Sequence, residues 1–221
     1  MSYSLLLIIF TIVGFKQNLV MALREKTPQN ILQCRALSKE LNYDKETMLR
    51  TTWTSVYSWK NDDCVVFSFS IPTEDFVRRV YEEVGHQLKE QPNWADPVLM
   101  MTVKFKNKML THNALLFKDV GFPGNFRIVP DLAYEPQPAD MTYDPQPLHK
   151  VSFKLMKVSS SQGCPKTKFM LILLCDTGVI VTAEVQGQCP RAPLVSAVAS
   201  RLKLYDGRLT CFKEYNITRL I

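Results

Sequence analysis

The stretch FMLILLCDTGVIVTAEV, residues 169–185, decides the class of fold that the sequence predicts. Two strongly apolar runs, residues 169–174 and 179–185, lie on either side of Asp176-Thr177-Gly178. Each run has the length of a strand rather than of a helix, and Asp and Gly are residues that a tight turn requires. The stretch therefore predicts an antiparallel β-hairpin.

The residues on both sides of this hairpin extend it to a small sheet with one helix. Residues 150–155 alternate between polar and apolar side chains, as in a strand with one buried face. After the hairpin, apolar residues recur at helical spacing over residues 193–202, and residues 208–215 have the pattern of a last strand. We therefore expect residues 150–221 to form one module.

A second set of elements precedes residue 129 and has the same composition of strands and helices. The clearest is an amphipathic helix that begins at Pro72-Thr73 and extends to Leu88. The other predicted elements are a helix over residues 28–41 and strands over residues 51–59, 64–71 and 98–108. These elements predict an N-terminal module over residues 23–128.

Residues 129–149 contain four acidic residues and no Lys or Arg, and include the tandem segments YEPQP (134–138) and YDPQP (143–147). Because proline restricts its own backbone and that of the preceding residue, this segment predicts a stiff linker. A docking peptide that presents Tyr134 and Tyr143 to a partner is the second interpretation. The predicted fold class is thus α+β, with two small antiparallel-sheet-plus-helix modules joined by a Pro-rich acidic linker.

The first 22 residues do not decide the cellular compartment of the protein. The apolar run LLLIIFTIVGF, residues 5–15, is too short as a helix to cross a membrane but suits a signal peptide or anchor. It is also rich in β-branched residues, which favours a buried strand, and Met21 offers an alternative start. The secretory pathway and a location in the cytoplasm or nucleus both remain open, whereas a multi-span membrane protein is excluded.

The six cysteines bear on the same question. Four of them follow residue 160, so in an exported chain we expect the disulfides among Cys164, Cys175, Cys189 and Cys211. Asn216 begins the only sequon noted, Asn216-Ile217-Thr218, and is the candidate glycosylation site.

No pattern in the sequence predicts catalysis. Aspartic proteases place their catalytic residue in an Asp-Thr-Gly loop, but this chain has one copy and only 43 residues after Gly178, so a hairpin turn is favoured. His86, His112 and His149 are scattered and lack metal-ligand spacing. We therefore expect no enzyme activity and neither a cofactor nor a metal.

The function that these features favour is a non-catalytic interaction or adaptor protein whose partner is another protein. Two alternatives stay open: a secreted or lumenal disulfide-containing binding protein, and a nucleic-acid-associated protein that uses residues 150–221. That region has 11 Lys and Arg against four Asp and Glu, a net charge of +7. The candidate contact residues are Lys104, Lys106, Lys108, Tyr134, Tyr143, Lys150 and Lys154.

Overall fold

The computed structural model describes ten ranges of the chain: residues 28–39, 41–59, 64–106, 110–119, 123–131, 149–158, 167–175, 178–184, 192–205 and 207–211. The helices are α2 (Pro28–Leu37), α3 (Lys45–Arg50), α4 (Glu74–Val84), η1 (Gly85–Gln87) and α5 (Ala192–Arg201). The strands are β1 (Trp53–Ser58), β2 (Val65–Ser70), β3 (Pro97–Phe105), β4 (Leu110–Lys118), β5 (Asn125–Pro130), β6 (His149–Val158), β7 (Thr167–Leu174), β8 (Gly178–Glu184) and β9 (Arg208–Leu209).

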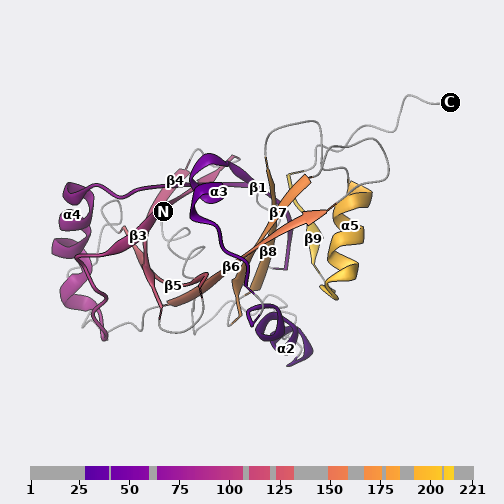
Figure 1. Ribbon diagram of the computed structural model, residues 1–221, viewed down its shortest axis with the longest axis horizontal. Helices are drawn as coiled ribbons and strands as arrows, with labels where there is room; N and C mark the ends of the chain where they lie inside the picture. Colours follow the sequence, from indigo (N-terminus) through magenta and orange to yellow (C-terminus); the bar gives the residue numbers. More distant parts are fainter. Residues whose placement is uncertain are drawn as a thin grey trace, which may run out of the picture.

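Eight of these strands form one closed antiparallel barrel. Each strand from β1 to β8 pairs with the next along the chain, and β8 pairs back with β1. The expected fold of two α+β modules is therefore wrong. The closing pair sets Trp53 opposite Glu184, so the predicted N-terminal and C-terminal sheets are parts of one sheet (Figure 1).

The predicted linker lies between two neighbouring strands of this barrel. Strand β5, which ends at Pro130, pairs antiparallel with β6, which begins at His149; one of the pairs is Phe126 with Val151. Residues 132–148 thus connect adjacent strands, and most of the expected linker lies outside the described residues.

The local elements agree better with the sequence patterns than the global arrangement does. Helix α4 begins after Thr73, whose hydroxyl accepts a hydrogen bond from the Phe76 N–H at 3.3 Å. The hairpin of β7 and β8, with Leu171 opposite Val181, confirms the prediction for residues 169–185. Strand β9 has only two residues, and residues 212–215 of the longer predicted strand lie outside the described ranges.

Three apolar clusters hold the barrel and its helices together. Since all eight barrel strands contribute to the first cluster, it fills the interior; Trp53, Phe67, Phe105 and Phe153 belong to it. The second cluster lies outside, where α2 and α5 cover β7, β8 and β1. In the third, α4 packs on the outer face of β4 and β5 through Val80. Figure 1 shows α4 and α5 on opposite sides of the barrel.

Candidate functional site

The interior of the barrel, which the first cluster fills with side chains, is the candidate binding site because every barrel strand contributes to it; we call this interior the chamber. Its walls are apolar and rich in aromatic rings. The rings of Phe69 and Phe153 meet edge to face with centroids 5.5 Å apart, and the centroids of Phe126 and Tyr43 lie 5.1 Å apart. A molecule bound here would contact hydrocarbon and aromatic surface.

One end of the chamber is closed by residues 41–50, which include α3. The Asn42 carbonyl accepts a hydrogen bond from the Leu155 N–H on β6 at 2.8 Å, and Met48 is fully buried in the interior cluster. Trp53, the first residue of β1, is also fully buried. This closed end therefore has a floor of well-packed side chains.

The strands of the hairpins β1–β2, β3–β4 and β7–β8 are connected at the opposite end, which we call the turn end. The interior residues there are also buried: Leu174 and Ile180 are 7% exposed and Phe105 is 3% exposed.

Three polar side-chain atoms face this apolar chamber with no hydrogen-bond partner in the described part of the chain. They are the Trp53 indole Nε1, the Tyr43 hydroxyl and His112 Nε2. His112 faces inward because it alternates along β4 with the interior residues Ala114 and Leu116, and its ring lies 6.1 Å from that of Phe105. A buried polar atom without a partner is costly, so these three atoms favour a bound polar group.

The same burial changes the protonation of two of these groups. Desolvation, with a smaller contribution from the negative charge of Asp44, raises the pKa of Tyr43 to about 12. Desolvation lowers the pKa of His112 below its ordinary 6.5, and the charge of Asp131 opposes this shift in part. Near neutral pH both side chains are therefore uncharged.

The interior cluster consists of hydrophobic residues, and toward the floor Lys168 on β7 alternates with its members Met170 and Ile172. Asp119 and Asp131 are buried, but they lie on the outer face of the barrel, where Arg127 and Arg79 bind them. The centre of the interior is therefore lined by hydrophobic residues, with a few polar groups and Lys168 at its edges.

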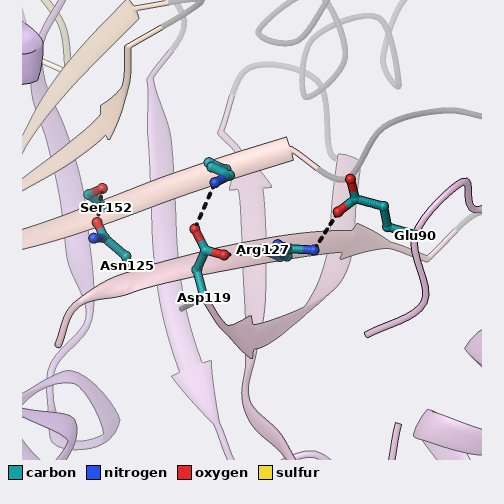
Figure 2. Close-up of polar contacts among 6 residues, drawn as sticks. Glu90, Asp119, Asn125, Arg127 and Ser152 are labelled. Carbon is teal, nitrogen blue, oxygen red and sulfur yellow. Dashed lines mark hydrogen bonds and ion pairs between the residues drawn. The ribbon is translucent and has the colours of Figure 1, made fainter. Parts of the chain in front are cut away.

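The charged groups gather instead in a network outside β4, β5 and β6 (Figure 2). Asp119 accepts a hydrogen bond from Arg127 Nε at 2.8 Å and contacts Lys150 Nζ at 3.1 Å, and Arg127 also contacts Glu90 at 2.6 Å. Burial alone would raise the pKa of Asp119, but the hydrogen bonds and charges of Arg127 and Lys150 hold it below its ordinary value. This network ties Glu90, which precedes β3, to the sheet.

The structure does not bring the predicted contact lysines together. Lys104 and Lys106 are exposed at the end of β3, while Lys150 and Lys154 are on β6, and β4 and β5 separate the two strands. Lys150 is occupied by Asp119. The other candidates, Lys108, Tyr134, Tyr143 and Asn216, lie outside the described residues.

Two disulfides join early parts of the chain to late ones. Cys175 pairs with Cys34 on α2, and Cys211 pairs with Cys64 just before β2. The expectation that bridges would form among the late cysteines thus named Cys175 and Cys211 but missed both of their partners. Cys164 and Cys189 lie outside the described ranges.

Sequence reasoning did not place Tyr43, Trp53 and His112 together on an inward face. The alternation around Trp53 and the isolation of His112 were visible, but neither pattern tells which face of a strand becomes enclosed.

Within the described residues, no group of three His, Cys, Asp or Glu side chains is placed to hold a metal ion. No helix in those same ranges is long and apolar enough to span a membrane. In comparisons with known proteins, no family model matches the sequence and no curated relative is found.

Proposed function

We propose that the protein is a non-catalytic binding protein of the secreted or lumenal type, and that its barrel holds one small, uncharged, mainly apolar molecule. The observation that carries this proposal is the set of three unpartnered polar atoms, on Tyr43, Trp53 and His112, inside an apolar chamber. Eight-stranded up-and-down barrels have an interior that is either filled by side chains or holds one small ligand, as in lipocalins and streptavidin.

The apolar lining supports an uncharged ligand. An ammonium group among these hydrophobic residues would lose its hydration, and an unpaired buried charge is strongly unfavourable. Trp53 can only donate a hydrogen bond, and Tyr43 keeps its proton up to a pKa of about 12. A ligand with carbonyl, ether or hydroxyl oxygens would accept from these groups.

The two disulfides support the secreted or lumenal location, since structural bridges persist in oxidising compartments. The adaptor and nucleic-acid alternatives have less support. Lys104 and Lys150 lie on strands that two others separate, and Lys150 already contacts Asp119. The described contact lysines on β3 and β6 therefore do not lie on neighbouring strands.

The test is a binding titration of the oxidised full chain with the uncharged fluorophore N-phenyl-1-naphthylamine. We expect saturable binding with one site, and displacement by a long-chain ketone at a concentration at least about tenfold below that of the alkylamine of equal length. Absence of saturable binding would contradict the proposed function, and equal displacement by the amine would contradict the uncharged class.

Two variants locate the site. Because one hydrogen bond contributes about 0.5–1.5 kcal/mol net, His112→Phe and Trp53→Phe should each weaken ketone binding about three- to tenfold if the ketone uses that group. Trp94→Phe is the matched control: Trp94 lies on the outer face, against Phe117, and donates to Gln91 at 2.9 Å. If neither interior variant weakens binding more than the control does, the ligand lies elsewhere.

A further inference from the structure

The barrel is closed by its shortest ladder at the seam between β1 and β2. Among the described residues, two pairs join these strands, Trp53 with Phe67 and Thr54 with Val66. The other neighbouring strands of the barrel are joined by four to eight pairs each. Toward the turn end, the β1–β2 seam thus lacks ordinary backbone pairing.

Where this ladder ends, a side chain replaces the backbone as the hydrogen-bond acceptor. The Val65 N–H donates to the Ser55 hydroxyl at 3.0 Å, in place of a backbone carbonyl of β1. The same hydroxyl lies 3.3 Å from the Cys211 sulfur. The pairing of β1 with β8 also shifts register between Ser55 and Tyr57. Ser55 is therefore the point at which β1 leaves β2 and meets the C-terminal segment.

Residues 207–211, which include β9, fill the rest of the seam. Tyr57 pairs with Leu209, the Thr210 N–H donates to the Val56 carbonyl at 3.0 Å, and the Gly207 N–H donates to the Tyr57 hydroxyl at 3.0 Å. A Cβ at Gly207 would lie 2.3 Å from the Tyr57 ring, so only glycine permits this approach. We call residues 207–211 the closing strand.

The closing strand lies partly at the surface. Arg208 and Leu209 are both exposed, Leu209 at 40%, while Thr210 is 2% exposed. Its described backbone hydrogen bonds join it to β1, and each contributes only a modest net stabilisation. The Cys64–Cys211 disulfide is the one covalent link between the closing strand and β2 among the described residues.

We propose that this disulfide is a redox latch: its reduction releases the closing strand and opens the barrel between β1 and β2 at the turn end. Behind the seam lie Val65 and Phe67 of the interior cluster, so the opening leads into the chamber. This inference rests on the proposed function, because the latch would control how fast a ligand enters and leaves.

The chemistry is ordinary thiol–disulfide exchange with a dithiol reductant. A thiolate of the reductant attacks one sulfur of the Cys64–Cys211 bond, which breaks as a mixed disulfide forms and the other cysteine leaves as a thiolate that takes up a proton. The second thiol of the reductant then displaces the first cysteine. Two cysteine thiols and one oxidised reductant result, and two electrons pass to the protein.

Exposure predicts that the two bridges differ in their response. Cys64 and Cys211 are both partly exposed. In the other bridge Cys175 is also partly exposed, but Cys34 is only 1% exposed and packs in the cluster beneath α2 and α5, so that bridge is accessible from one cysteine rather than two. Because exchange needs access to sulfur, the Cys64–Cys211 bond should be reduced first.

The experiment combines graded reduction of the native full chain by dithiothreitol with alkylation, peptide mapping and hydrogen exchange. We expect the Cys64–Cys211 bridge to be lost first. Amide exchange should then rise at least about tenfold in β9 and at Val65, with no comparable rise in β3 and β4. The variant C64S/C211S should show the same exchange pattern, and the pair C34S/C175S is the matched control.

Ligand kinetics give the second readout. The rates of N-phenyl-1-naphthylamine entry and exit should both rise in C64S/C211S, and less or not at all in C34S/C175S. Unchanged exchange at the seam after reduction of Cys64–Cys211, or an equal rise in the control pair, overturns the latch. Seam exchange that rises in a protein that binds no probe supports the latch and contradicts the proposed function.

If C64S/C211S fails to fold, the reduced wild-type chain still provides the exchange measurement.

Discussion

Replacement of Asp119 by alanine tests the charged network of Figure 2. The Asp119 side chain is 7% exposed and accepts from Arg127 Nε at 2.8 Å. A hydrogen bond that involves a charged partner contributes about 1.5–3 kcal/mol. Lys150 adds little, about 0.2–1 kcal/mol, because its side chain is 67% exposed. We therefore expect Asp119→Ala to lower the free energy of unfolding by about 2–4 kcal/mol at neutral pH.

The stability lost in Asp119→Ala should depend on pH. The pKa of Asp119 is lower in the folded protein than its ordinary value of 3.8. The unfolded chain thus binds the proton more readily, so the stabilisation is complete above about pH 4 and disappears as the pH falls through the folded pKa. The difference between wild type and Asp119→Ala should shrink well below about pH 4.

Urea unfolding followed by tryptophan fluorescence measures the loss of stability at neutral and at acid pH. Equal m values for wild type and variant would show that the folded and unfolded states are otherwise unchanged. Glu90→Gln is the control, because Glu90 contacts Arg127 from a side chain that is 61% exposed and should contribute less than about 1 kcal/mol. A deficit for Asp119→Ala below about 0.5 kcal/mol, or one that is equal at neutral and acid pH, refutes the reasoning.

Three further predictions concern the interior and α4. Because burial lowers the pKa of His112, wild type should lose stability as the pH falls below about 6.5, and His112→Phe should flatten that slope in urea titrations. Because the pKa of Tyr43 is about 12 in the folded protein, wild type should lose stability above about pH 10. In a spectrophotometric titration of the tyrosines, Tyr43→Phe should remove one phenol that ionises near pH 12. Arg79 binds buried Asp131 through two contacts of 2.8 and 3.0 Å, so Arg79→Met should cost about 2–3 kcal/mol and raise amide exchange in α4 but not in α5.

The local elements were predictable because they depend on nearby residues. Residues 98–105 alternate since β3 has the interior on one face and solvent on part of the other. The run from Phe169 to Leu174 is apolar throughout because the interior covers one face of β7 while α2 and α5 cover the other. That continuous run was a signal that helices cover the sheet from outside.

Closure of the barrel was not predictable from such patterns. Trp53 at the start of β1 pairs with Glu184 at the end of β8, so the closing pair joins the two ends of the barrel sequence. Alternation within a strand does not reveal which other strand it will pair with. The acidic, Pro-rich composition of residues 129–149 suits a linker between domains and a long connection between neighbouring strands equally well. The site was missed for the same reason, because Tyr43, Trp53 and His112 share a chamber only once the ring of strands is complete.

The closure of the ring through β1 and β8 also has a consequence for biosynthesis. Strand β1 is the first barrel strand to leave the ribosome. Strand β8, with which β1 forms the longer of its two barrel ladders, ends at Glu184. Throughout translation of the intervening residues, β1 has an unpaired edge and an apolar face, which are the features that promote aggregation. Both bridges likewise await a late cysteine, Cys175 or Cys211. Nascent chains of this protein should therefore depend on chaperones until β8 and Cys211 have been synthesised, and truncated chains that end before β8 should be found among the insoluble products.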